Sequence, residues 1–293
     1  MATQLVPLPE VERLSASVVR ILGGNPGKFT LQGTNTYLVG RGPQRLLIDT
    51  GQGFPAWANS LKTVLLEEKA TVQKALITHW HHDHVKGIPD LLKICPQARV
   101  YKHQPDEGQA NIEDGQVFQV EGATVRAFHT PGHTVDHMAF ILEEEDAIFS
   151  GDNVLGHGTA VFEDLKVYLT SLHKMQNRVS GRAYPGHGAV IEKASAKITD
   201  YIRHRQQREE EVLRVLRTGS VEAETTESSN NTSQSSWTPL ELVKVIYRDV
   251  PESLHLPASH GVAQILQKLE SEGKVEHHAE SGGWSLSNGR PAL

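Results

Sequence analysis

Residues 78–84 read Thr-His-Trp-His-His-Asp-His and directly follow the apolar run Ala75-Leu76-Ile77. Histidine and aspartate side chains are ligands that divalent transition metals prefer in proteins. On a loop that leaves a strand, alternate side chains can point to opposite sides, so this segment can offer two pairs of ligands. The first pair is His79 with His81, and the second is Asp83 with His84. A surface cluster of histidines is the alternative, and it is disfavoured because the pattern does not stand alone.

Three later segments each follow a strand-like run with a glycine turn and one further potential ligand. They read Thr130-Pro131-Gly132-His133, Ser150-Gly151-Asp152 and Pro185-Gly186-His187. Loops that leave one edge of a rigid sheet pair can converge on a single site. We therefore expect His133, Asp152 and His187 to join the ligands of residues 78–84.

Short apolar runs alternate with Gly- and Pro-rich turns between residues 18 and 184, with amphipathic stretches between some of them. The predicted strands are 18–22, 36–39, 45–48, 75–78, 99–102, 125–128, 138–142 and 147–149. The predicted helices are 56–68, 163–175 and the long polar stretch 194–216. Strands interleaved with helices predict a layered αβ architecture in which helices cover sheet faces.

The end of the chain differs in composition from the part before it. Residues 218–236 have almost no apolar content, which predicts a flexible linker. Thr238-Pro239-Leu240-Glu241 has the pattern of a capping box with proline at the first helical position. A further helix over 258–272 and a hairpin over 274–286 would complete a winged-helix-like module. The expected organisation is an αβ domain over 1–217, the linker over 218–236 and the module over 237–293.

The composition excludes several classes of protein. Cys95 is the only cysteine, so a scaffold held by intrachain disulfides is excluded. No apolar run approaches the roughly 18 residues that cross a bilayer, and the first residues have no signal-peptide pattern. We therefore expect a cytoplasmic protein that does not enter a membrane. The 29 basic residues against 35 acidic ones give a net charge of -6, which disfavours a protein that simply coats nucleic acid.

The series of motifs resembles the metallo-β-lactamase superfamily over about residues 18–190. The resemblance implies an αββα sandwich, with a metal centre at one edge and the winged-helix-like module after it. It implies that one metal is bound by His79, His81 and His133, that the other is bound by Asp83, His84 and His187, and that Asp152 bridges the two. Both ligand sets are present, so two divalent metal ions are expected. Zinc is the default, and manganese or iron is the alternative, because such mixed sites select weakly between metals.

The resemblance also implies a reaction class. Two cations a few ångströms apart would lower the pKa of a shared water from about 15.7 toward about 7, which favours hydrolysis, and Asp83 or Asp152 could orient that water. Asp49 resembles the family's acidic group beside the metal-bound histidines, although it could simply open a turn. His137 is either a contact of the substrate or ligands, or a polar residue at a strand start. Trp80 either borders the site or belongs to the core, and Lys86 contacts an anionic substrate group or points to solvent.

Residues 22–37, residues 161–165 and the C-terminal module resemble one branch of that superfamily. The branch contains lactamase-like endoribonucleases and the thioesterases that release products from fungal non-reducing polyketide synthases. The segments 23–30, 112–115 and 151–158 resemble the fungal enzymes more. This favours a dinuclear-metal thioesterase that releases a polyketide acyl chain from an acyl carrier protein.

Two other hydrolases remain as alternatives, namely a single-strand-specific endoribonuclease and a small-ester, lactone or lactam hydrolase. A nuclease needs a basic track for phosphates. The candidates on the long helix, interrupted by Glu209, Glu210 and Glu211, are Arg203, Arg205, Arg208, Arg214 and Arg217. Residues 237–293 contain five Lys and Arg against seven acids, so we expect no DNA binding. RNA is a partner only under the nuclease alternative, and we expect the module to shape the entrance to the site instead.

Overall fold

The computed structural model describes residues 5–219 and 236–287 and divides the chain into two compact units. The first unit extends to Tyr201, and the second begins at Ile202, inside helix α5 (Ala194–Thr218). The linker predicted over 218–236 lies almost entirely outside the described residues. No helix in the described parts of the chain is long and apolar enough to cross a membrane.

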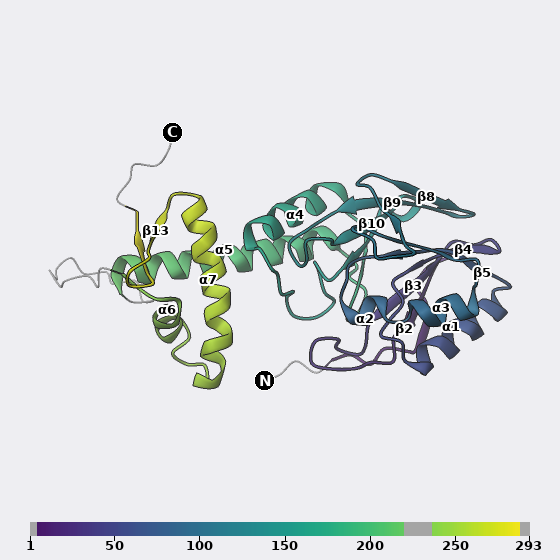
Figure 1. Ribbon diagram of the computed structural model, residues 1–293, viewed down its shortest axis with the longest axis horizontal. Coiled ribbons are helices and arrows are strands. Elements are labelled where there is room, and N and C mark those ends of the chain that lie inside the picture. Colours follow the sequence, from purple (N-terminus) through teal and green to yellow (C-terminus); the bar gives the residue numbers. More distant parts are fainter. Residues whose placement is uncertain (1–4, 220–235, 288–293) are drawn as a thin grey trace. The chain divides into compact units, whose positions relative to one another are not determined.

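A sheet of seven strands and a sheet of five strands form the centre of the first unit (Figure 1). The seven-stranded sheet is antiparallel from its first to its fourth strand and parallel from there on. In order, its strands are β1 (Val11–Arg13), β2 (Val18–Leu22), β3 (Asn35–Val39), β4 (Gln44–Ile48), β5 (Thr71–Ile77), β6 (Arg99–Lys102) and β7 (Ala110–Asn111). The five-stranded sheet has the order β12 (Ala183–Pro185), β11 (Ala147–Gly151), β10 (Met138–Leu142), β9 (Ala123–His129) and β8 (Val117–Val120).

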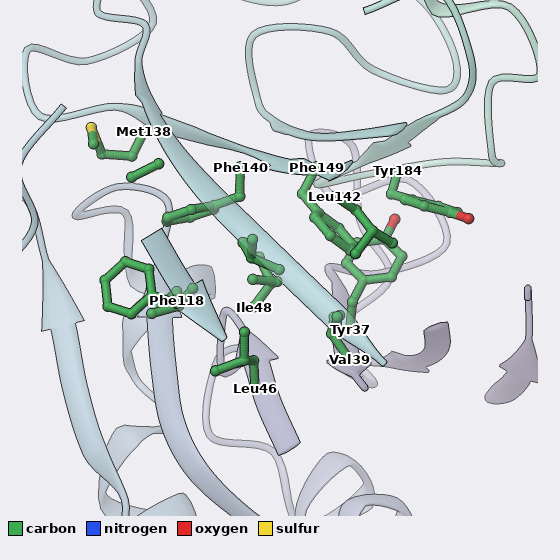
Figure 2. Packing of buried hydrophobic residues seen from close by; sticks show 14 of the residues in the cluster. Tyr37, Val39, Leu46, Ile48, Phe118, Met138, Phe140, Leu142, Phe149 and Tyr184 are labelled. Atoms are coloured by element: carbon green, nitrogen blue, oxygen red, sulfur yellow. The ribbon is translucent and has the colours of Figure 1, made fainter. Parts of the chain in front are cut away.

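The main core lies between the two sheets. Figure 2 shows Tyr37 of β3 close to Phe149 and Tyr184 of the other sheet. The centroid of the Tyr37 ring lies 5.2 Å from that of Phe149 and 5.6 Å from that of Tyr184. All five residues of β3 and of β10 are buried, and β10 accordingly appears in the sequence as a continuous apolar run, whereas β3 begins with two polar residues. The sheets are therefore packed face to face with a layer of large side chains between them.

Helices cover the outer faces of the sheets (Figure 1). Trp57 and Leu61 of α1 (Pro55–Glu67) and Leu91 of α3 (Ile88–Ile94) pack in a second core with Leu38 and Leu47, on the outer face of the seven-stranded sheet. Helix α4 (Leu165–Arg178) has an apolar face and lies beside the five-stranded sheet. The predicted αββα sandwich is thus confirmed.

The second unit contains two helices and a hairpin. Helix α6 (Pro239–Ile246) begins with the predicted capping box, since Thr238 and Glu241 each bind the other's backbone N–H. Helix α7 (His255–Ser271) follows, and β13 (Val275–His278) pairs with β14 (Gly283–Leu286). The winged-helix-like module is confirmed.

Most predicted elements lie within a few residues of their observed positions, and 18–22, 99–102 and 138–142 agree at both ends. The strands β1, β7 and β8 and the helices α2 (His82–Val85) and α3 were not predicted. The first two of those strands have only three and two residues, and the third is mostly exposed or half-buried. Such short or solvated strands have no apolar run that would reveal them.

Candidate metal centre

Four of the candidate ligands lie together where strands of both sheets end. The ligand atoms of His79, His81, His133 and Asp152 all lie within 4.8 Å of one another. The Nδ1 atom of His81 is 2.9 Å from Nε2 of His79 and 3.1 Å from Nε2 of His133. Three imidazole nitrogens therefore point at one another, and a cation between them would satisfy all three lone pairs.

A second group of ligands lies next to the first. Its members are Asp83, His84 and His187. The Oδ2 atom of Asp83 is 3.3 Å from Nε2 of each histidine. Asp152 faces both groups, because its Oδ2 is 3.7 Å from Nε2 of His133 and 3.2 Å from Nε2 of His187. One carboxylate thus lies between two clusters of potential ligands.

The way in which the chain separates the two groups differs from the expectation. Alternation on an extended loop was predicted, and this was wrong, because residues His82–Val85 form the short helix α2. His79 and His81 precede that helix, whereas Asp83 and His84 lie on it. The second pair therefore lies on a helical turn and not on a strand-like alternation.

Buried atoms without partners show that these residues suit metal ions. The Nε2 atom of His84 and the Oδ1 atom of Asp152 are buried and have no hydrogen-bond partner in the described parts of the chain. A buried polar atom without a partner costs free energy, so native proteins rarely leave one unmatched. Imidazole and carboxylate groups form the donor set of zinc and related ions. The two clusters can therefore hold divalent metal ions.

Three of the five candidate histidine ligands are held by a partner on the ring nitrogen that faces away from the cluster. Asp49, which is buried, lies 2.7 Å from Nδ1 of His84 and also accepts the hydroxyl of Thr78. Thr78 in turn lies 2.9 Å from Nδ1 of His79. The carbonyl of Val161 accepts from Nδ1 of His133 at 2.8 Å. Such partners fix the orientation of a ligand histidine. The sequence predicted Asp49 as such a partner but not Thr78, whose position directly before His79 is the one signal that could have indicated it.

His137 is also buried, but it faces the back of the centre. Its Nδ1 lies 3.0 Å from the hydroxyl of Thr130, and its Nε2 accepts the backbone N–H of Asp152 at 3.2 Å. It is not among the residues that line the adjoining cavity. The structure therefore places His137 against the backbone of Asp152 and outside the lining of the cavity.

The electrostatics of the centre differ between the two clusters. Burial lowers the pKa of His81 to about 4 and lowers the pKa of His79 well below its ordinary value. Burial also opposes the charged form of His187, but the carboxylates of Asp152 and Asp83 raise its pKa to about 9. Burial opposes ionisation of Asp83 as well, yet His84 and His187 hold its pKa well below its usual range. His79 and His81 are thus neutral, whereas the second cluster favours positive charge on His187 beside ionised Asp83.

A cavity of about 410 Å³ opens beside both clusters. Besides the ligands, it is lined by two loops, which contribute Lys28, Phe29, Thr30, Leu31, Leu155, His157, Gly158, Thr159, Ala160 and Val161. Phe29 is 75% exposed and Val161 is 64% exposed, so the rim is apolar. Trp80 is 46% exposed, which excludes the core alternative, and it is not among the residues that line this cavity. Lys86 is exposed and does not line this cavity, which favours the solvent interpretation.

Comparisons with known proteins agree with this architecture. A family model described as the metallo-beta-lactamase superfamily matches residues 29–107 and 98–187, and one described as a beta-lactamase associated winged helix domain matches residues 238–284. A solved beta-lactamase domain protein from Burkholderia ambifaria has a TM-score of 0.76 at 17% identity, and the match covers 98% of this chain and 96% of that one. At that identity the likeness shows the fold alone.

Two relatives are much more similar in sequence. A protein of Aspergillus chevalieri named atrochrysone carboxyl ACP thioesterase is 48% identical over 283 residues, which are 96% of this chain and 89% of that protein. The atrochrysone carboxyl ACP thioesterase dmxR1 of a Cryptosporiopsis species is 46% identical over 282 residues, which are 95% of this chain and 87% of that protein. The likeness to both thus covers the two units and nearly the whole chain.

Proposed function

This chain belongs to the metallo-β-lactamase superfamily, and from that premise we propose that it is a thioesterase that releases an acyl chain from an acyl carrier protein. The observation that carries the proposal is a pair of ligand clusters that share Asp152 and open into a cavity with an apolar rim. The names of the two relatives, at 46–48% identity over nearly the whole chain, support the choice of a carrier-bound thioester.

We propose that each cluster binds one divalent metal ion, with Asp152 between the two. The first ion would be bound by His79, His81 and His133, and the second by Asp83, His84 and His187. Zinc is our choice of metal and manganese the alternative, because nitrogen and oxygen ligands do not select strongly between them. When bound, such a pair supplies a water whose pKa is lowered toward about 7.

The side chains of the protein would position the reactants. Asp83, whose side chain is 21% exposed, reaches the cavity, and its low pKa keeps it ionised as an acceptor for a proton of the attacking water. Asp152 is more deeply buried and would hold that water from the other side. Attack on the thioester carbonyl forms the carbon–oxygen bond of a carboxylic acid. The carbon–sulfur bond then breaks, and the sulfur leaves with a proton as the thiol of the carrier.

The cavity fits an apolar acyl chain of modest size. Its volume of about 410 Å³ lies within the range of small-molecule sites, which is roughly 300–1,000 Å³. Phe29, Leu31, Leu155 and Val161 would contact the acyl chain. Lys28 is the one Lys or Arg among the described residues that line the cavity, so the cavity wall offers little to a nucleic-acid backbone. We therefore propose a polyketide acyl chain as the substrate, with the carrier protein as the partner.

A parallel assay tests this function. Purified protein would be offered an acyl thioester on a carrier protein, a single-stranded RNA and a simple lactone, each at the same enzyme concentration. We expect release of the free acid from the thioester, and we expect the Asp152→Ala variant to lose it, which excludes a contaminating esterase. Cleavage of RNA that the same variant loses, with the thioester left intact, would replace this proposal by the nuclease.

A further inference from the structure

Residues at the start of strand β3 contact two of the three candidate ligands of the second cluster. Thr34 binds the side chain of Asp83, and Asn35 binds the backbone on both sides of His187. We propose that Thr34 and Asn35 are positioning residues that assemble the second metal site. This inference rests on the proposed dinuclear function, and it assigns a role to the segment Gly33-Thr34-Asn35-Thr36-Tyr37, which the ligand assignment leaves unexplained.

Thr34 orients the carboxylate of Asp83. Its side chain is fully buried, and its hydroxyl donates to Oδ2 of Asp83 at 2.9 Å. That oxygen is the atom that lies 3.3 Å from Nε2 of both histidines of the second cluster. The hydroxyl therefore holds the carboxylate oxygen that faces the histidines of the second cluster.

Asn25 fixes the direction in which the Thr34 hydroxyl donates. The Nδ2 atom of Asn25 donates to Oγ1 of Thr34 at 3.0 Å, and Oδ1 of Asn25 accepts the backbone N–H of Thr34 at 2.9 Å. A hydroxyl has one proton, so a hydroxyl that accepts from Asn25 directs its own proton to Asp83. The surrounding glycines make room for this arrangement, because a Cβ atom at Gly23 would lie 2.7 Å from Oδ1 of Asn25.

Asn35 holds the loop that carries His187. Its Nδ2 atom donates to the carbonyls of Pro185 and Gly188, each at 2.9 Å, and its backbone N–H donates to the carbonyl of Gly186 at 2.7 Å. Three hydrogen bonds from one residue therefore bracket His187. The hydroxyl of Tyr37 adds a fourth to this loop, since it donates to the carbonyl of Pro185 at 2.6 Å.

These backbone hydrogen bonds matter because the ring nitrogen of His187 that faces away from the cluster has no partner in the described parts of the chain. That nitrogen is Nδ1, and it is buried. The corresponding nitrogens of His79, His84 and His133 are each held by a neighbouring group. The position of His187 therefore depends on its loop, and Asn35 holds that loop at three carbonyls.

The neighbouring Thr36 provides a matched control. It lies two residues after Thr34, its side chain is also fully buried, and its hydroxyl also has two partners. Those partners are the carbonyl of Ile21 and Nε1 of Trp57, and neither is a metal ligand. Replacing either threonine with valine removes a buried hydroxyl and should cost similar stability, but only the change at Thr34 touches the second cluster.

The test measures zinc binding by the full-length protein after removal of metal, by titration against a chromophoric chelator. We expect Thr34→Val and Asn35→Ala to weaken the second zinc by about 10–100-fold, the usual effect of losing such a partner. The first zinc should keep its affinity, because Thr34 and Asn35 make no hydrogen bond with His79, His81 or His133 in the described residues. Thr36→Val should bind both ions as the wild type does, and Thr34→Ser, which keeps the hydroxyl, should restore the second.

Two results would overturn the inference without touching the proposed function. The first is that Thr34→Val binds the second zinc with the affinity of the wild type. The second is that Thr36→Val loses as much affinity for the second zinc as Thr34→Val does. Thermal unfolding of the metal-free variants separates misfolding from positioning, because Thr34→Val and Thr36→Val should lose similar stability. A wild-type protein that binds only one zinc would instead overturn the dinuclear proposal, and this inference with it.

Discussion

Lys102 and Asp136 form a buried ion pair that links the two sheets beside the first cluster. Lys102 is the last residue of β6, and Asp136 lies in the segment between His133 and His137 that leads into β10. Their Nζ and Oδ2 atoms are 2.9 Å apart, and their side chains are only 4% and 2% exposed. The pair therefore connects the loop of one candidate ligand to the opposite sheet.

Replacing Lys102 with methionine would leave the carboxylate of Asp136 buried, with the hydroxyl of Thr134 still donating to it at 2.7 Å. We expect the free energy of unfolding to fall by about 3–5 kcal/mol, because removing one partner leaves an uncompensated buried charge. The double variant Lys102→Met/Asp136→Leu removes both charges, so its stability should return close to that of the wild type. The exposed pair of Lys93 and Asp90 is the control, and Lys93→Met should cost less than about 1 kcal/mol.

Hydrogen exchange of the backbone amides of β10 is the appropriate assay. The chain has two compact units, so thermal unfolding of the whole protein can rank variants but does not give the free energy of unfolding of the first unit alone. Amides of a central strand exchange only when the first unit unfolds, and their rates give its free energy of unfolding directly. The reasoning fails if Lys102→Met costs no more than Lys93→Met. It also fails if the double variant is as unstable as the single one.

Three further outcomes are expected. Protein purified without chelator should contain about two equivalents of divalent metal by elemental analysis, and chelation should lower its thermal midpoint, because ligands that bind only the folded state stabilise it. Asp152→Ala and His81→Ala should each abolish thioester hydrolysis while the circular dichroism spectrum stays that of the wild type, since both residues lie on loops outside the two cores. Glu143 accepts hydrogen bonds from Arg126 and Arg178, which lower its pKa below the usual 4.5. Its contribution is present above that pH and is lost as the pH falls through the folded-state pKa, so the stability difference between wild type and Glu143→Gln, under about 1 kcal/mol at neutral pH, should vanish in acid.

The candidate ligands could be predicted from the sequence because each follows a strand in a short, distinctive motif. The carboxyl ends of β5 and β11 and the loops after β9 and β12 place them together, and strand order alone makes that convergence plausible. The local geometry of residues 78–84 could not be predicted in the same way. A run of His and Asp has no apolar periodicity, so nothing in the sequence distinguished an extended loop from the helical turn His82–Val85.

The groups that hold the ligands were harder to predict, because their contacts join residues far apart in the chain. The amide of Asn35 binds carbonyls 150 and 153 residues away, and Thr34 binds Asp83 across 49 residues. No spacing rule relates such positions, since the contact exists only once the two sheets have packed. The interaction that brings these segments together is the isolated bridge between Thr34 and His187, where the start of β3 meets the opposite sheet.

The difference between the predicted and the observed start of β3 concerns the residues that support the second cluster. The apolar pattern predicted a strand beginning at residue 36, whereas β3 begins at Asn35 and the bridge at Thr34 extends it by one residue. Polar residues at a strand start are usually assigned to the preceding turn, because they interrupt the apolar run. Here Thr34 and Asn35 are both buried, and their side chains form hydrogen bonds with the segments that carry Asp83 and His187. A buried strand can thus begin with polar residues at the edge of a sheet where candidate ligands converge. Such residues are better interpreted as supports for those ligands than as part of the turn.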